Sequence, residues 1–85
     1  IEISLDSTHP EIHDEFRGHK GAWEKTVEGI KNCVEAGLFT ALAMTVTKKT
    51  MNEVDDMLDL TKELGAQRFI HFNFVPIILN YIPNY

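Results

Sequence analysis

Residues 1–18, IEISLDSTHPEIHDEFRG, have the pattern of a strand followed by a short helix. Apolar residues at positions 1, 3 and 5 alternate with Glu2, Ser4 and Asp6, so one strand face is apolar and the other is polar. The STHP segment then predicts a turn, and Pro10 is suited to the first turn of a helix that Gly18 ends. The pattern therefore predicts a group of polar side chains at the end of a strand.

Composition limits what this group of side chains can belong to. The chain has 85 residues, enough for one small domain, and its 44% hydrophobic and 25% charged residues are typical of a soluble globular protein. A net charge of -5 argues against a nucleic-acid partner. The sequence has no run of about 18 apolar residues, so a membrane partner is not expected either. The single cysteine, Cys33, cannot form an internal disulfide, which favours a reducing, cytoplasmic location. Because the sequence starts inside a strand without a methionine, we expect a piece of a longer protein.

Two helices and two further strands follow. Trp23, Val27, Ile30 and Val34 have helical spacing, which predicts a helix from position 22 that ends near Gly37. Residues 38–46, LFTALAMTV, predict a strand buried on both faces.

The second helix is expected to begin at Asn52, a residue type that caps helices, and to end at Gly65. Residues 68–74, RFIHFNF, predict a third strand. The expected apolar face of the second helix consists of Val54, Met57, Leu58, Thr61 and Leu64.

This order of elements predicts an α/β fold, β-α-β-α-β, with three parallel strands and two crossover helices on one face. We expect the covered face to include Ile3, Leu5, Ile70 and Phe72. The opposite face would then carry Glu2, Ser4, Asp6, Ala41, Ala43, Thr45, His71 and Asn73. Parallel sheets are normally covered on both faces, so this polar face needs more strands of a barrel, the tail, or a second copy in a homodimer.

Several segments together resemble one enzyme family. ISLDS, HDEFRG, GAWEKTVEGIKNCVEAGL, TVTKK and GAQRFIHFNFVP are similar to the middle of radical S-adenosylmethionine (SAM) enzymes, closest to the SPASM-type branch with haem-maturation and peptide-modifying members. The resemblance covers residues 1–76 and implies the fourth to sixth strands of a partial (β/α)6 TIM-like barrel. Residues 77–85, IILNYIPNY, form a tail unlike that family.

The resemblance also implies cofactor contacts at matching positions. Ser4 would reach the methionyl part of SAM, and Arg17 would pair with the SAM carboxylate. Asn73 and Val75 match positions that pass the adenine. His71, on the expected polar face, is a candidate for contact with the substrate.

The residues themselves leave structural alternatives open. Ser4 can instead bond backbone groups at the strand end, Val75 can simply pack, and Arg17 can pair within its own turn with Glu11 or Asp14. For Asp6 and Asp14 we expect a structural role, in which their carboxylates accept backbone N–H bonds and order the loop.

No metal site is expected from the histidines. His9, His13 and His19 are separated by four and six residues across a helix start and a glycine stop, so one helix face cannot present all three. The sequence also lacks a Ser-His-Asp set, a phosphate-binding glycine loop and zinc-ligand spacing.

The resemblance implies SAM and a 4Fe-4S cluster as cofactors of the parent protein. The Cys-x3-Cys-x2-Cys loop of the family is missing, and one cysteine cannot hold such a cluster, so we expect this chain to be inactive alone. The expected function of the parent is haem or tetrapyrrole biosynthesis on a small-molecule substrate. The alternatives are a peptide-modifying SPASM maturase and a non-catalytic, self-associating αβ module.

Overall fold

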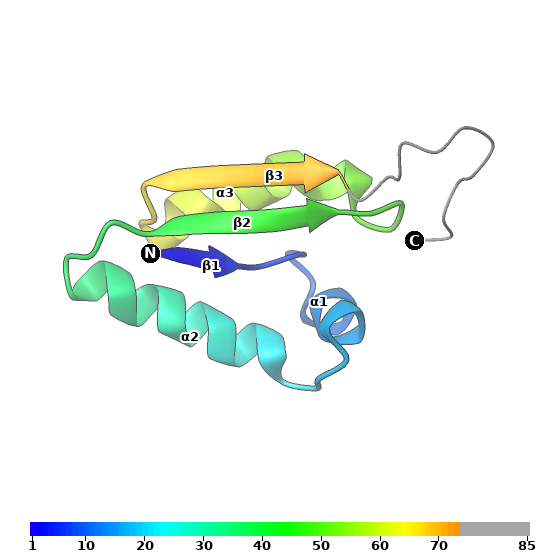
Figure 1. The fold of residues 1–85 in the computed structure, drawn as a ribbon, viewed down its shortest axis with the longest axis horizontal. Coiled ribbons are helices and arrows are strands. Elements are labelled where there is room, and N and C mark those ends of the chain that lie inside the picture. Colours follow the sequence, from blue (N-terminus) through cyan, green and yellow to red (C-terminus); the bar gives the residue numbers. More distant parts are fainter. Residues whose placement is uncertain (74–85) are drawn as a thin grey trace.

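The chain folds as a three-stranded parallel sheet with helices in the connections (Figure 1). The computed structural model describes residues 1–73, so the expectations for Val75 and for the tail at 77–85 lie outside the described residues. β2 is the central strand, with β1 and β3 on its two sides. The elements are β1 (Glu2–Ser4), α1 (Pro10–Arg17), α2 (Ala22–Glu35), β2 (Ala41–Val46), the 3-10 helix η1 (Met51–Glu53), α3 (Val54–Leu64) and β3 (Arg68–Asn73).

The two long helices, α2 and α3, pack against the same face of the sheet. Ile3, Leu42 and Phe69 lie side by side across the three strands, and all three belong to the core that contains side chains of both helices. The predicted fold class, three parallel strands with two crossover helices on one face, is therefore confirmed for the described residues. The buried members of the core are Leu5, Val27, Ile30, Leu42, Met44, Val46 and Met57. Full burial of one such side chain contributes about 1.5–3 kcal/mol of hydrophobic free energy.

The first two helices have the predicted ends. Pro10 is the first residue of α1, and Gly18 follows its last residue. The helix α2 begins at Ala22 as expected, and the N–H of Leu38 bonds to the carbonyl of Cys33 (3.0 Å) beyond Gly37. Both predicted stops are therefore confirmed.

The second strand begins later than predicted. Leu38 and Phe39 are 44% and 59% exposed and lie before β2, which starts at Ala41. The N–H of Thr40 donates to Oε1 of Gln67 (2.9 Å), and the N–H of Gln67 donates to the carbonyl of Thr40 (2.9 Å). These two bonds hold the start of β2 beside the start of β3.

The prediction that Asn52 caps the helix ending at Gly65, which is α3, is wrong. Asn52 lies inside η1, and α3 begins only at Val54, without a side-chain cap. The turn before η1 is closed instead by Thr50, whose Oγ1 accepts the N–H of Thr47 (3.0 Å). Leu58 was also expected in the buried face of α3, but it is 39% exposed, and Leu60 packs against the core.

The predicted facing of the third strand is wrong. Met44, a buried core residue, is in register with His71, whereas Phe72 pairs with Thr45. His71 and Asn73 therefore share the helix-covered side of the sheet, and Ile70 and Phe72 share the other side. The ring of His71 stacks on that of Phe69 at 5.9 Å between centroids, as expected for neighbours on one face.

On the sheet face turned away from α2 and α3, the central strand carries small or polar side chains, as predicted. On β3, this face carries the apolar Ile70 and Phe72, which was not predicted. Ser4, Ala43 and Ile70 lie side by side there, and Phe72 on the same face is 53% exposed. Apolar surface therefore replaces the expected imidazole and amide. Closure into a barrel and self-association through this face both stay predictions.

Candidate functional site

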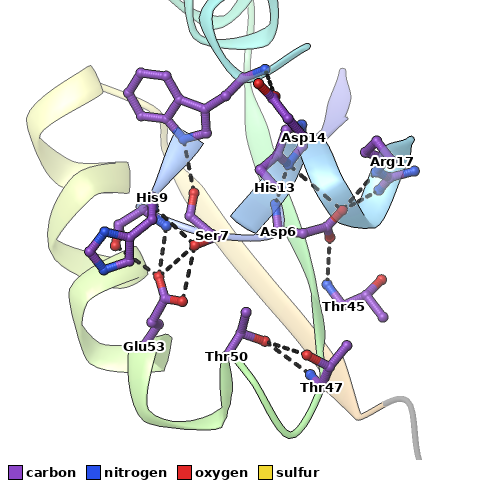
Figure 2. A network of polar contacts seen from close by, with 12 residues as sticks. Asp6, Ser7, His9, His13, Asp14, Arg17, Thr45, Thr47, Thr50 and Glu53 are labelled. Atoms are coloured by element: carbon purple, nitrogen blue, oxygen red, sulfur yellow. Dashed lines mark hydrogen bonds and ion pairs between the residues drawn. The ribbon is translucent and has the colours of Figure 1, made fainter. Parts of the chain in front are cut away.

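Asp6 is the centre of a polar network where β1 ends (Figure 2). The residue is only 2% exposed. Its Oδ1 accepts the N–H of Thr45 in β2 (2.9 Å), and its Oδ2 lies 2.7 Å from both Nε and Nη2 of Arg17. A buried carboxylate is costly unless it is paired and hydrogen-bonded. These contacts satisfy Asp6 and fix the position of Arg17.

His13 is held against the same residue and is almost fully buried. Its Nδ1 accepts the backbone N–H of Asp6 (3.1 Å), so the proton of the neutral ring is on Nε2. Burial lowers the pKa of His13 below its usual 6.5; the Asp6 carboxylate opposes this shift, and the Arg17 guanidinium reinforces it. The imidazole is therefore neutral at pH 7.

An open groove of about 410 Å³ lies between β1 and the first two helices. This volume is in the range of small-molecule sites, about 300–1,000 Å³. The groove is lined by Glu2, Ile3, Ser4, His13, Arg17, Ala22 and Thr26. Ser4 supplies a hydroxyl, His13 an imidazole and Arg17 a guanidinium, a set that suits an anionic ligand with hydrogen-bond acceptors.

A second buried carboxylate joins two loops beside this network (Figure 2). Glu53, at the end of η1, accepts the hydroxyl of Ser7 (2.8 Å to Oε1) and both the N–H (2.9 Å) and the hydroxyl (2.8 Å) of Thr8. Ser7 is fully buried, and its Oγ also accepts the N–H of His9 (2.9 Å). The loop after β1 is thereby tied to the segment after β2.

Asp14 fixes the connection between α1 and α2. Its two carboxylate oxygens accept the backbone N–H groups of Gly21 and Trp23, both at 2.8 Å. The bond from the N–H of Trp23 contributes most to lowering the pKa of Asp14 below its usual 3.8, and the bond from Gly21 lowers it further. Both Asp6 and Asp14 accept backbone N–H bonds, as expected. Those of Asp14 order its loop, whereas Asp6 accepts from Thr45 in β2 rather than from its own loop.

The structure brings together only part of the predicted cofactor site. Ser4 and Arg17 line one groove, whereas Asn73 and His71 lie on β3, the strand at the opposite edge of the sheet. Val75 lies outside the described residues. The suggested pairing of Arg17 with Glu11 or Asp14 is not what the structure has, because its carboxylate partner is Asp6.

The sequence analysis missed two participants, His13 as a groove residue and Glu53 as a buried acceptor. A signal for His13 was present, since it is four residues before Arg17 and so shares its helix face. For Glu53, a carboxylate in front of an amphipathic helix usually indicates a solvated first turn, and no periodicity distinguishes the buried case.

Within residues 1–73, no group of three or more histidine, cysteine, aspartate or glutamate side chains is arranged to hold a metal ion. Nor does any helix of that part of the chain have the length and apolarity needed to span a membrane.

Comparisons with known proteins identify the family of the chain. The family model of the radical SAM superfamily matches residues 1–61. The antilisterial bacteriocin subtilosin biosynthesis protein AlbA of Bacillus subtilis is 43% identical over 75 residues, 88% of this chain and 16% of AlbA. The AdoMet-dependent heme synthase of Methanosarcina barkeri is 37% identical over 76 residues, 89% of this chain and 22% of the synthase.

A third relative, the mycofactocin maturase MftC of Mycolicibacterium smegmatis, is 31% identical over 67 residues, 78% of this chain and 17% of MftC. The chain thus spans about a fifth of the length of these relatives. The matched residues contain β1, the groove and the buried network around Asp6. The chain therefore belongs to the radical SAM superfamily, in the branch of haem-synthesis and peptide-maturation proteins that the sequence resemblance indicated.

Proposed function

We propose that this chain forms part of the SAM-binding site of a radical SAM enzyme, with Ser4 and Arg17 binding the amino-acid end of the cofactor. The observation that carries the proposal is that both residues, predicted independently of the fold, line the same groove. Membership of the radical SAM superfamily supplies the cofactor class.

The geometry around Arg17 suits a carboxylate ligand. A guanidinium has five N–H donors in a fixed fork, and Asp6 engages it through Nε and Nη2. The side chain of Arg17 is 40% exposed, so its outer edge remains accessible from the groove. Asp6 therefore orients the fork, and the accessible donors can pair with the ligand carboxylate.

The chain does not fit the iron–sulfur cluster that the family uses for its radical chemistry. Such clusters are held by several cysteine thiolates, and the only thiol of this chain is Cys33, in α2. We therefore propose that the cluster ligands come from elsewhere in the parent protein and that this chain alone is inactive. Its own residues would bind and orient SAM.

The remaining predicted positions receive unequal support. Asn73 and Val75 stay proposed contacts of the adenine. The proposed substrate contact of His71 loses its original argument, because that argument assumed the face opposite the helices. A cytoplasmic location also stays a prediction.

Two substrate classes remain for the parent enzyme. Tetrapyrroles are the first, and the name of the 37% identical heme synthase supports them. A peptide substrate is the second, and the 43% identity to AlbA, a bacteriocin biosynthesis protein, favours it. Incubation of the full-length reconstituted protein with SAM and either an iron porphyrin or the peptide encoded nearest its gene distinguishes them by mass spectrometry of the product.

The SAM site is tested by calorimetric titration of SAM into the purified chain. We expect binding that Ser4→Ala weakens and that Arg17→Ala weakens by about 10-fold or more, since a hydrogen bond to a charged group is worth about 1.5–3 kcal/mol. Lys31→Ala, a change at an exposed position of α2, is the matched control and should leave the affinity unchanged. Lack of binding, or equal affinities in all variants, would contradict the proposal.

A further inference from the structure

His13 is a buried polar residue, and its contacts in the network around Asp6 involve only one of its two ring nitrogens. Nδ1 accepts the N–H of Asp6 and lies 3.9 Å from the Asp6 carboxylate. The second ring nitrogen, Nε2, takes no part in these contacts and carries the proton of the neutral ring.

Nε2 is the ring nitrogen that no described contact of His13 uses. Nε2 thus has no hydrogen-bond partner among the described residues, although the His13 side chain is only 2% exposed. The open space that His13 lines is the groove, which it shares with Ser4 and Arg17.

The donor is also fixed in direction. Asp6 bonds to His13 through its backbone N–H and to Arg17 through its carboxylate, so one buried residue sets the orientation of both the imidazole and the guanidinium. Fixed donors bind an acceptor without a large loss of side-chain entropy. Because the imidazole is neutral, it adds a hydrogen bond without adding a second positive charge beside Arg17.

We propose that His13 is a ligand-binding residue of this groove, whose Nε2–H donates a hydrogen bond to the carboxylate that Arg17 pairs with. The ligand class is an α-amino acid carboxylate, such as the methionyl end of SAM. This inference rests on the proposed function, since it adds a third residue to the same site.

Two substitutions separate the two nitrogens of the ring. His13→Asn keeps an acceptor near the position of Nδ1 for the N–H of Asp6 but has no donor that reaches the groove. His13→Gln reaches the position of Nε2 with an amide N–H. We expect His13→Asn to weaken SAM binding about 10-fold and His13→Gln to recover most of that loss, because the donor and not the packing is what the ligand uses.

A ligand without the carboxylate is the internal control. 5′-Methylthioadenosine shares the adenosine and the sulfur of SAM but lacks the amino-acid end. We expect its affinity to be the same for the wild-type chain and for His13→Asn. An equal loss for both ligands would show that His13 only supports the structure and would overturn the inference.

A measurement on the unmodified protein covers the case in which the variants do not fold. Nitrogen NMR of the histidine rings reports each nitrogen separately, and we expect SAM to shift the Nε2 signal of His13 while Nδ1 remains a hydrogen-bond acceptor. An unchanged Nε2 signal at saturating SAM would overturn the role of His13, even where Ser4→Ala and Arg17→Ala weaken binding. If the wild-type chain does not bind SAM, the proposed function fails first, and this inference fails with it.

Discussion

The two strand-to-strand connections of this molecule both join neighbouring parallel strands, but they contain different helices and side chains. The first runs from β1 through α1 and α2 to β2, and the second runs from β2 through η1 and α3 to β3. Each places one long helix on the same sheet face. Only the first adds a second α-helix, α1, and this connection borders the groove and contains residues around Asp6.

The added segment contributes little to the apolar core. Within α1 the buried residue is His13, a polar one, whereas the buried core residues of the helices come from α2 and α3. The hydrogen bonds of Asp6, Asp14 and Glu53 hold the segment in place instead. We infer that the second connection serves stability, and that the first also positions ligand-binding side chains.

The largest effect expected is on stability, from the second connection. Met57 of α3 is fully buried, and Met57→Ala should lower the free energy of unfolding by about 2–5 kcal/mol, because a cavity remains. SAM affinity, measured where the variant is still folded, should not change. Urea unfolding measures the free energy of unfolding, and calorimetry measures the SAM affinity.

The matched control for Met57 is Met51, which is 60% exposed, and Met51→Ala should change stability by less than about 0.5 kcal/mol. A large loss of SAM affinity in Met57→Ala would show that the two connections are not separable.

A change at the centre of the first connection should affect both properties. Asp6→Ala leaves the partly buried N–H of Thr45 without an acceptor and Arg17 without its partner, so we expect a loss of about 2 kcal/mol of stability. SAM affinity should fall as well, because the guanidinium is no longer oriented. Chemical denaturation and calorimetry of the same preparation measure both.

Asp59→Ala is the control for Asp6, since Asp59 is an exposed carboxylate of α3. If Asp6→Ala were destabilised but bound SAM as tightly as the wild type, the network would be structural only.

The contrast between the connections also explains what the sequence could predict. Asp6 accepts a backbone N–H as expected, but from Thr45, which is 39 residues away. The order of the elements followed from helical spacing and glycine stops, and the role of Asp14 followed from the tendency of short carboxylates to accept local backbone N–H groups. These are local signals. Ser4 and Arg17 came from the family resemblance, and the fold then placed them in one groove.

The errors came from contacts between distant residues. In RFIHFNF both alternations contain aromatic or branched residues, so the pattern alone does not choose the buried face. The pairing of Gln67 with Thr40 sets the register and turns Phe69 toward the helices. Likewise, the acceptor role of Glu53 depends on Thr8, 45 residues earlier in the chain.

Two glycines give a smaller and more local comparison. Gly65, after α3, has φ +82°, and a Cβ there would meet Cγ1 of Val34 at 3.0 Å. Gly21, before α2, has φ +85° with open space around it. Each Gly→Ala change should cost about 1–2 kcal/mol from the left-handed backbone, and Gly65→Ala should cost more because of Val34.

Thermal unfolding of the two alanine variants tests this order. Equal losses would mean that Val34 moves aside freely, and that the second connection is no more tightly packed than the first.

The smallest expected effect is a dependence of stability on pH. Burial lowers the pKa of His13 in the folded chain, so below pH 6.5 the unfolded chain binds a proton that the folded chain resists. The free energy of unfolding should therefore decrease as pH falls from 6.5 toward the folded-state pKa of His13, and this contribution should be constant above 6.5. The variant His13→Asn should lose that part of the slope, whereas Lys31→Ala should keep it. Urea unfolding at closely spaced pH values measures the slope, and an identical slope in His13→Asn would mean that another group causes it. Because the same neutral ring donates to the ligand in our proposal, SAM affinity should fall only as the pH approaches the folded-state pKa of His13, where the protonated ring no longer accepts the N–H of Asp6 and is displaced.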